Sequence, residues 1–371
     1  MKITRIETIP VLVPIKPQFA IRFSQGVHSA SPFLIVKMHT DEGVVGLGEV
    51  SCTPLWSGED HVTAKHFIDG TLGLALIGRD PRDVTANFNL IDQLVAGNVF
   101  TKSALEMAWW DILGKSANLP LYRLLGGAVR DRVPLKFSIS GAEPEKAAEL
   151  AVWAVSEGFR TVKVKVGLKP ETDIARVKAV RSAVGAEIRI GIDANGGWSV
   201  RDAIPAIRQL ESECGISFAE QPVSALDSED MSAIRKAVNV PIIADESVFT
   251  LQDAMCVARN GAADVLSVYV GKGGGIGGAR RMASVAEAAG LTCTVGSNLE
   301  LGIASAAMIH LALSTPGIGA EDFPCDIIGP YYYESDILAD PLPLADGFAS
   351  PLELPGLGVT IDEEILARYA V

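Results

Sequence analysis

The chain alternates valine with lysine over Thr161-Val162-Lys163-Val164-Lys165-Val166-Gly167. Successive side chains of a β-strand point to opposite faces, so Lys163 and Lys165 share one face and the valines share the other. One interpretation is an edge strand with solvated lysines, because edge lysines deter unwanted strand pairing. The residues that follow favour the other interpretation, a strand whose lysines serve a functional site.

From about residue 133 onward, short apolar stretches alternate with helical patterns at intervals of roughly 25 residues. This alternation is typical of βαβ units on a parallel sheet. Eight repeats predict a TIM-type barrel, with an open doubly wound sheet as the structural alternative. The expected strands are 133–139, 161–166, 187–193, 216–220, 241–245, 265–270, 291–295 and 319–323.

The preceding part of the chain, residues 1 to about 125, has the pattern of a small α+β unit. Its long segment 17–31 and the segment 52–60 lack clear periodicity, and long loops of compact domains are often lids. The tail is too short for a domain and is expected to pack back on this first unit. The expected strands are 3–13, 33–39 and 44–49, and the expected helices are 62–76, 84–94 and 103–117.

Composition narrows the functional classes. The 371 residues are 48% hydrophobic and carry a net charge of −13, which disfavours nucleic acid or an anionic membrane as a partner. The five cysteines are far apart, as expected for free thiols in a reducing compartment. The chain lacks a signal-peptide pattern and an apolar run long enough for a membrane helix. A soluble cytoplasmic protein is expected.

Polar residues recur where the predicted strands end. Lys165 ends the second strand, and Asp193, Glu220 and Asp245 end the third, fourth and fifth. Barrel enzymes place their chemistry at these ends. Three converging carboxylates would repel one another, and Mg²⁺ is the usual oxygen-liganded cation that relieves this. Each acid taken singly is better explained as a helix N-cap or a solvated carboxylate, but the three in register with a lysine pair predict a metal site.

These motifs carry a resemblance to a known family. The segments 163–165, 193–195, 220–222 and 245–247, together with 104–115 and 120–127, resemble the enolase superfamily and its muconate lactonizing enzyme-like branch. The resemblance implies a capping domain (1–125), a modified (β/α)₇β barrel (126–345), a C-terminal segment on the cap (346–371), one Mg²⁺ and a homo-oligomer. It also implies that Lys165 is the base and that Lys163 stabilises an enediolate formed from a carboxylate substrate.

The chain departs from that pattern at the sixth strand. Where lactonizing relatives carry a second catalytic lysine, the ungapped register places Tyr269, and Lys272 matches a different lysine before a glycine turn. A tyrosine, with a pKa of about 10, suits a proton donor better than a base. One lysine and one tyrosine favour anti elimination of a β-hydroxyl over racemisation. The chain is similar to hydroxyproline-processing members, which predicts dehydration of cis-3-hydroxy-L-proline to Δ¹-pyrroline-2-carboxylate.

Further substrate contacts are expected from both units. Glu300, Glu321 and Asp322 could receive a secondary ammonium, and the aromatic rings of Trp56 and Phe19 could cover it. The remaining expected contacts are Asn195, Ser297 and Lys272.

Three other functions compete with the dehydratase. The first is a racemase or epimerase of a proline derivative or another amino acid, with Tyr269 or Lys272 as second base. The second is a sugar-acid dehydratase, which the missing histidine and sixth-strand aspartate disfavour. The third is a non-catalytic metal-binding homologue, which the intact lysine pair disfavours.

Overall fold

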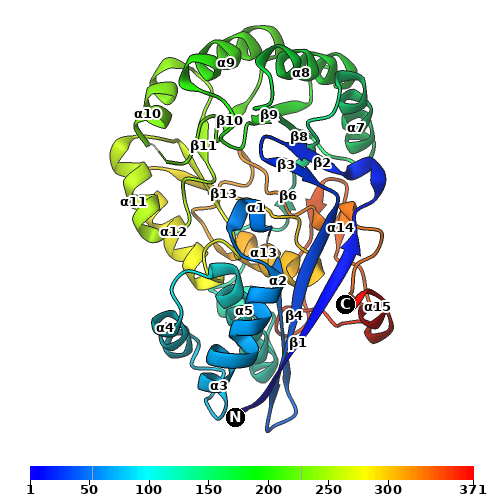
Figure 1. The fold of residues 1–371 in the computed structure, drawn as a ribbon, viewed down its shortest axis with the longest axis vertical. Helices are drawn as coiled ribbons and strands as arrows, with labels where there is room; N and C mark the ends of the chain where they lie inside the picture. Colours follow the sequence, from blue (N-terminus) through cyan, green and yellow to red (C-terminus); the bar gives the residue numbers. More distant parts are fainter. Residues whose placement is uncertain (52, 227) are drawn as a thin grey trace.

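The computed structural model describes every residue except Cys52 and Asp227. An N-terminal α+β unit lies at one end, and a curled parallel sheet wrapped by helices lies at the other (Figure 1). The predicted fold class, an α/β barrel with an N-terminal cap, is confirmed. The predicted lid segment 52–60 begins at Cys52, which is outside the described residues.

The N-terminal unit is organised around an antiparallel sheet of order β1-β4-β5, as the sequence predicts. Helix α5 lies directly on β5. The two backbones approach so closely at Gly48 that a Cβ there would overlap the carbonyl of Ala104. The predicted helix 62–76 is broken, since Gly70 leaves helical geometry (φ −98°, ψ −108°). The elements are β1 (Ile3–Pro14), β4 (Ala30–Thr40), β5 (Val45–Ser51), α2 (His61–Phe67), α3 (Gly73–Leu76), α4 (Val84–Leu94), α5 (Val99–Ala117) and α6 (Leu121–Leu124).

The barrel sheet has seven parallel strands in the order β13-β12-β11-β10-β9-β8-β7, and its helices lie around the outside (Figure 1). The strands are β7 (Phe137–Ile139), β8 (Thr161–Lys165), β9 (Arg189–Asp193), β10 (Phe218–Glu220), β11 (Ile242–Ala244), β12 (Val265–Val268) and β13 (Thr292–Val295). The helices are α7 (Pro144–Ser156), α8 (Pro170–Val184), α9 (Val200–Cys214), α10 (Ser228–Ala237), α11 (Leu251–Asn260), α12 (Ile276–Ala288) and α13 (Gly302–Ser314).

The predicted eighth strand, 319–323, is wrong. These residues form a turn in which the N–H groups of Asp322 and Phe323 both donate to the Gly319 carbonyl, at 3.1 and 2.8 Å. The next residues close the barrel instead: Cys325 N–H donates to Pro134 O (2.9 Å) and Asp326 N–H donates to Val295 O (2.8 Å). The acid at the eighth strand position is therefore Asp326.

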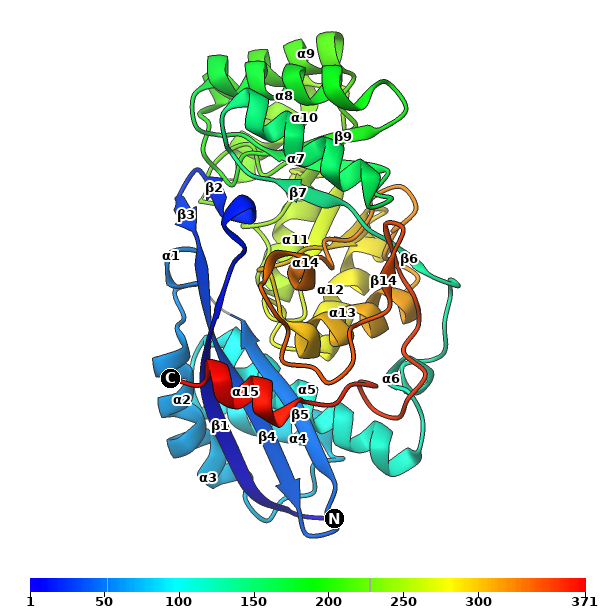
Figure 2. The ribbon, with the colours of Figure 1, turned by 90° about the vertical axis from the view of Figure 1, so that its right-hand side faces the viewer.

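The C-terminal segment runs back from the barrel to the cap. Strand β15 (Phe348–Ala349) pairs with β14 (Leu344–Ala345) and with β6 (Val133–Pro134), which is split from β7. Helix α15 (Glu363–Tyr369) lies beside β1 (Figure 2), and the last residue donates its N–H to Pro10 O at 3.0 Å.

Two buried glutamates of the N-terminal unit cap barrel helices. Glu49 of β5 accepts the N–H groups of Leu301 (2.8 Å) and Ala304 (3.0 Å) at the start of α13. Glu106 of α5 accepts two N–H groups at the start of α12, at 2.8 and 2.9 Å. The first N–H groups of a helix have no partner within the helix, and the carboxyl oxygens of these two glutamates accept from them. These carboxylates fix the cap over the barrel.

Replacing Glu49 with glutamine is expected to flatten the pH dependence of stability between about pH 5 and pH 8. Burial, helped by Asp336 and Glu300 and opposed by the two backbone N–H groups, raises the pKa of Glu49 from 4.5 to about 8. The folded chain thus keeps a proton that the unfolded chain releases, so the free energy of unfolding falls as pH rises through this window, by at most about 1.4 kcal/mol per unit. Urea unfolding at several pH values measures the slope.

Glutamine keeps one acceptor oxygen and has no proton to lose, so its cost should be constant with pH. Glu149→Gln, an exposed position on α7, is the control and should retain the wild-type slope. Identical slopes for Glu49→Gln and the wild type would contradict the prediction.

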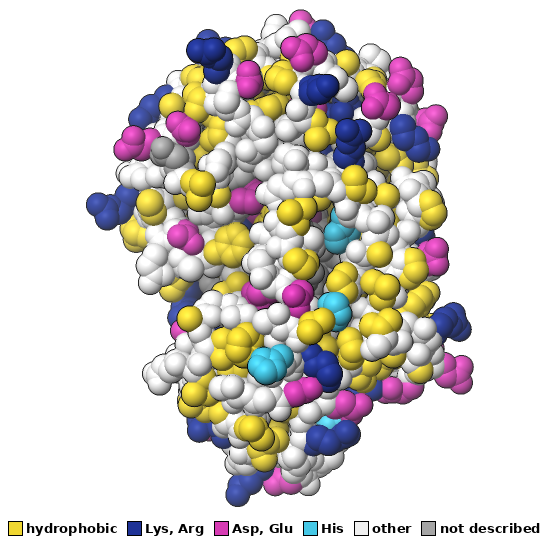
Figure 3. Space-filling model, in the orientation of Figure 1, with side chains coloured by type: hydrophobic (Ala, Val, Ile, Leu, Met, Phe, Trp, Pro, Cys, Tyr) yellow, Lys and Arg dark blue, Asp and Glu magenta, His cyan; other side chains and the backbone are white. Residues whose placement is uncertain are grey.

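The surface shows no preference for one charge on the face drawn in Figure 3, where acidic and basic side chains of the described residues are interspersed. Among the described residues, no helix combines the length and apolar character needed to cross a bilayer.

Candidate active site

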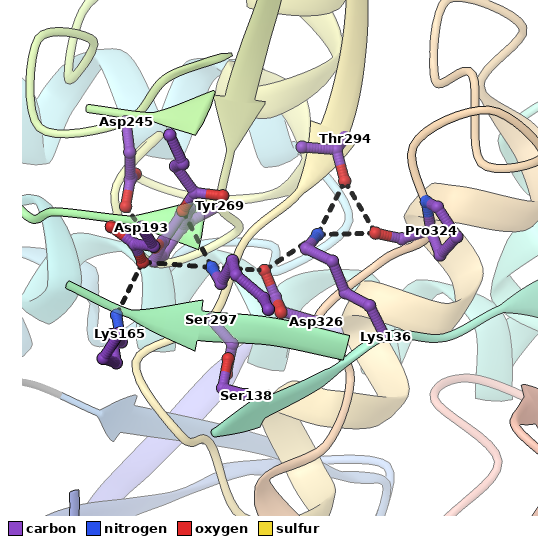
Figure 4. A network of polar contacts seen from close by, with 12 residues as sticks. Lys136, Ser138, Lys165, Asp193, Asp245, Tyr269, Thr294, Ser297, Pro324 and Asp326 are labelled. Atoms are coloured by element: carbon purple, nitrogen blue, oxygen red, sulfur yellow. Dashed lines mark hydrogen bonds and ion pairs between the residues drawn. The ribbon is translucent and has the colours of Figure 1, made fainter. Parts of the chain in front are cut away.

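The two lysines of β8 meet acids of other strands inside the barrel, and Figure 4 shows Lys165 beside Asp193. Lys163 Nζ lies 2.8 Å from Glu220 Oε1 and 3.0 Å from Asp326 Oδ2. Lys165 Nζ lies 2.6 Å from Asp193 Oδ2, its neighbour in the strand register. Parallel strands end at the same edge, which is why residues far apart in the chain meet here.

Burial and charge oppose each other in this cluster. Burial alone would lower the pKa of Lys163, but Asp326, Glu220 and Asp193 outweigh it and raise that pKa well above its usual value. Burial would raise the pKa of Asp193, yet the ammonium groups of Lys165 and Lys163 lower it to about 2. Burial and the nearby acids raise the pKa of Glu220 to about 8 despite Lys163. Of Asp193 and Glu220, Glu220 is the one whose negative charge is less compensated by nearby ammonium groups.

The donor set fits Mg²⁺. Asp193, Glu220 and Asp245 come from three successive strand ends, and Glu220 Oε2 is buried without a hydrogen-bond partner. A buried unpaired oxygen is costly, and Mg²⁺ prefers carboxylate ligands. Among the described residues, no three acidic, His or Cys side chains already converge on one point. Each of the three carboxylates is instead turned onto an ammonium group, at 2.6 to 2.8 Å.

Glu220→Gln is expected to weaken Mg²⁺ binding by about tenfold or more, because it replaces the charged ligand whose free oxygen fits the cation. Isothermal titration with MgCl₂ measures the affinity. In the wild type, Mg²⁺ at 100 times its Kd should add about 2.7 kcal/mol to the free energy of unfolding. Glu187→Gln, on the exposed turn before β9, is the control. Equal Mg²⁺ affinity in Glu220→Gln and the wild type would exclude this carboxylate as a ligand.

A lid from the N-terminal unit closes the mouth of the barrel. It consists of the hairpin β2 (Ile21–Phe23) and β3 (Gly26–His28) and the short helix α1 (Pro54–Ser57). Beneath it lies a cavity of about 80 Å³. The cavity is lined from the lid by Ile21, Phe23, His28, Thr53 and Trp56, and from the barrel by Lys163, Lys165, Asp193, Asn195, Asp245, Tyr269, Ser297 and Asp326, among others.

Trp56 and Asn195 line both this cavity and a second one of about 410 Å³. Trp56 Nε1 donates to Glu246 Oε1 at 3.0 Å, and the same oxygen accepts from Asn195 Nδ2 at 2.8 Å. Asn195 Oδ1 in turn accepts from Lys165 Nζ at 2.8 Å. Trp56 and Asn195 therefore lie at the pocket, as the sequence predicts.

Tyr269 directly follows β12 and faces the pocket. Its hydroxyl donates to Asp245 Oδ2 at 2.8 Å, and its ring stacks on Trp56 with a centroid distance of 5.5 Å. Burial, Asp245, Glu220 and Glu246 raise the pKa of Tyr269 well above its usual value, so the phenol keeps its proton. Strands β8 and β12 are four positions apart in the sheet, so Lys165 and Tyr269 approach the cavity from opposite sides of the barrel.

Two of the expected substrate contacts lie behind the pocket wall. Lys272 is fully buried and donates to Asp245 O (2.7 Å) and Oδ1 (2.6 Å), with its ammonium 4.3 Å from the centre of the Tyr269 ring. Glu300 is buried and accepts from Ser297 Oγ (2.5 Å) and Asn298 N (2.9 Å). Both are placed to hold other residues: Lys272 holds Asp245, and Glu300 orders the loop that carries Ser297.

Three other expected contacts lie away from the pocket. Glu321 and Asp322 are exposed, and their carbonyls accept from Arg189 at the start of β9, at the opposite end of the barrel. The error follows from the misplaced eighth strand. Phe19 packs into an aromatic cluster with Trp153, at 4.7 Å between ring centres, and anchors the lid from outside.

Two titratable residues of the pocket, Asp326 and His28, were not expected from the sequence. Asp326 has a buried Oδ1 without a partner, while its Oδ2 is bound by Lys136 (2.9 Å) and Lys163. A strand placed at residues 324–326 would have identified it. His28 ends β3 and reaches the pocket from the lid, and no local sequence signal marks it.

Comparisons with known proteins agree with this geometry. Residues 5–126 match the mandelate racemase / muconate lactonizing enzyme N-terminal domain, and residues 146–365 match the enolase C-terminal domain-like family. The chain is 35% identical to N-succinyl-L-Arg/Lys racemase of Bacillus cereus over 374 residues, covering 100% of this chain and 98% of that protein. It is 34% identical to muconate cycloisomerase 1 of Rhodococcus opacus, with the same coverage.

A solved structure shares the whole architecture. The dipeptide epimerase of Enterococcus faecalis, in complex with Mg and the dipeptide L-Leu-L-Tyr, is 33% identical, with a TM-score of 0.92 over 97% of this chain and 100% of that chain. The chain therefore belongs to the mandelate racemase / muconate lactonizing enzyme family of the enolase superfamily of enzymes.

Proposed function

We propose that the protein is a dehydratase that removes the α-proton of a small β-hydroxy amino acid and expels its hydroxyl as water, with cis-3-hydroxy-L-proline as the substrate. The observation that carries the proposal is the unequal pair in one cavity: an amine, Lys165, and a phenol, Tyr269, on opposite sides of the barrel. An anti elimination needs a base on one face and an acid on the other.

The proposed chemistry divides into two proton transfers. Lys165 takes the α-proton once its ammonium has released a proton to solvent, and Lys163 holds its positive charge beside the site. Asp193, Glu220 and Asp245 would hold Mg²⁺, which would supply positive charge to stabilise the substrate carboxylate as it gains electrons. The electron pair then forms a carbon–carbon double bond as the C–O bond breaks, and Tyr269 protonates the leaving hydroxyl. The enamine product tautomerises to Δ¹-pyrroline-2-carboxylate, while Lys165 and Tyr269 exchange protons with solvent to reset.

The size and charge of the cavity support a small amino acid. About 80 Å³ is far below the roughly 300–1,000 Å³ of pockets for drug-sized ligands. Asp326, rather than the expected Glu321 or Asp322, offers an unpaired carboxylate oxygen for a secondary ammonium. Such a charge-assisted hydrogen bond is stronger than a neutral one.

A racemase or epimerase is the second candidate, because relatives that span the whole chain bear those names. A racemase needs a competent base on each face of the substrate, and Tyr269 would have to supply the second. The Tyr269 hydroxyl donates to Asp245 Oδ2 at 2.8 Å, and a phenol suits a proton donor better than a base, which favours the lyase.

Incubation of the Mg²⁺-loaded enzyme with cis-3-hydroxy-L-proline in D₂O, followed by NMR, separates the two functions. Loss of the hydroxyl with formation of Δ¹-pyrroline-2-carboxylate supports the dehydratase. Recovery of substrate with deuterium at an inverted α-carbon supports the epimerase and overturns the main proposal.

A further inference from the structure

Three side chains, His28, Ser31 and Tyr333, form a continuous series of hydrogen bonds from the lid to the barrel loops. His28 Nε2 is hydrogen-bonded to Ser31 Oγ, which lies 2.8 Å from the hydroxyl of Tyr333. The Tyr333 hydroxyl donates to the carbonyl of Leu299 at 2.6 Å. Ser31 and Tyr333 are buried, and the Tyr333 ring packs on Phe33 at 5.5 Å. The series thus joins the lid to the loop that follows β13.

The hydrogen bond from Tyr333 to Leu299 fixes where the proton lies in each of the other hydrogen bonds of this series. A carbonyl can only accept, so the single hydroxyl proton of Tyr333 points to Leu299. Tyr333 is then an acceptor toward Ser31, which must donate its own proton to Tyr333. Ser31 is therefore an acceptor toward His28, and the proton lies on Nε2 of the imidazole.

The other ring nitrogen remains free. No hydrogen bond joins Nδ1 of His28 to the described residues, and Nδ1 is not among their buried unpaired atoms, so it is open to solvent. His28 lines the cavity under the lid. Burial also lowers the pKa of His28, which favours the neutral ring.

We infer that His28 is a specificity-determining residue, held as the Nε2–H tautomer so that its Nδ1 lone pair accepts a hydrogen bond from an N–H or O–H group of the substrate. Ser31 and Tyr333 are positioning residues that act through His28. The inference about the substrate rests on the proposed function, because it assumes that a small amino acid occupies this cavity. The tautomer itself does not depend on that function.

Removing the Tyr333 hydroxyl should change the Nδ1 atom of His28, which faces the cavity, from a hydrogen-bond acceptor to a donor. In Tyr333→Phe the Ser31 hydroxyl loses its acceptor and can donate to His28 Nε2, which moves the ring proton to Nδ1 and replaces an acceptor in the cavity by a donor. The phenyl ring keeps the packing against Phe33. Tyr331→Phe, at a half-buried position two residues earlier whose ring packs on Phe159 instead, is the matched control.

Nitrogen-15 NMR of the Mg²⁺-loaded enzyme, labelled at its five histidines, reports the tautomer directly. The His28 signals are assigned by their loss in His28→Gln. The wild type and Tyr331→Phe should show a protonated Nε2 and an unprotonated Nδ1, and Tyr333→Phe should show the reverse. Ser31→Ala, which removes the partner of Nε2, should give a mixture. An Nδ1–H ring in the wild type overturns the inference and leaves the dehydratase proposal standing.

Binding measurements identify the substrate group that His28 receives. L-Proline retains the ring N–H, and tetrahydrofuran-2-carboxylate has neither N–H nor hydroxyl. If the N–H is the donor, Tyr333→Phe should weaken L-proline by about fivefold to tenfold and leave tetrahydrofuran-2-carboxylate unchanged. If the hydroxyl is the donor, only the Kd for cis-3-hydroxy-L-proline should rise, measured in the Lys165→Ala background so that no turnover is needed. If Tyr333→Phe changes neither the affinity for L-proline nor that for cis-3-hydroxy-L-proline, His28 does not determine specificity. This holds even if the tautomer is as expected and no turnover is seen.

Discussion

Replacing Lys165 with alanine is expected to lower kcat by about 10³-fold or more, because it removes the base that takes the α-proton. The side chain reaches the cavity from the end of β8, and no other amine among the described residues lines it except Lys163, whose charge is held by three carboxylates. Exchange of the α-hydrogen with D₂O should be lost together with elimination, since both begin with the same proton transfer. Steady-state kinetics and NMR measure the two rates.

Two comparisons separate lost chemistry from lost structure. Lys169→Ala, four residues further along and exposed, should keep wild-type kinetics. Adding methylamine to Lys165→Ala should restore part of the exchange, because a small amine can occupy the space beside Asp193 and Asn195 that the ammonium leaves. Wild-type exchange in Lys165→Ala would show that another group is the base.

The barrel was predictable because its sequence signals are local. Each βα unit carries its own apolar strand and helical pattern, and the parity of β8 alone places both lysines on one face. The last barrel position was not predictable in this way. Its segment 324–326 contributes isolated bridges rather than a regular strand, and a polar turn at 319–323 was mistaken for it.

The part of the site that comes from the cap could be read from the sequence only in part, because Trp56 was expected at the pocket and His28 was not. His28 and Trp56 reach the cavity only because β5 and α5 fix the cap on the barrel, through contacts such as Glu49 with the start of α13. These contacts join residues more than 150 positions apart, and no periodicity reports them. The sequence identified the site residues at the ends of regular strands one by one. In the lid it identified the loop segments and Trp56, but it did not single out His28.

Replacing Tyr269 with phenylalanine is expected to uncouple the two halves of the reaction. Dehydration should fall by about 10²-fold to 10⁴-fold, the usual contribution of a positioned general acid. Exchange of the α-hydrogen in D₂O should continue, because Lys165 and its partners Asp193 and Asn195 are untouched. Phenylalanine can keep the stacking on Trp56, so the lid should stay closed. NMR in D₂O measures exchange and elimination in one experiment.

The variant also removes a hydrogen bond to Asp245, and this effect must be separated from the loss of the acid. Asp245 keeps the ammonium of Lys272 at 2.6 Å, so Mg²⁺ affinity should change little, and titration with MgCl₂ checks this directly. Tyr331→Phe should leave both rates unchanged.

The outcome for Tyr269→Phe decides between the two candidate reactions, because they use the phenol in opposite senses. A lyase needs Tyr269 to give a proton to a leaving hydroxyl. If the protein is a lyase, substrate incubated with Tyr269→Phe in D₂O should therefore accumulate deuterium at the α-carbon with its configuration retained. An epimerase needs the same group to take and return a proton on the other face, so the wild type should invert the α-carbon and the variant should not. If exchange and dehydration fall by the same factor at unchanged Mg²⁺ affinity, Tyr269 acts before the carbon–oxygen bond breaks, and the role of proton donor is wrong.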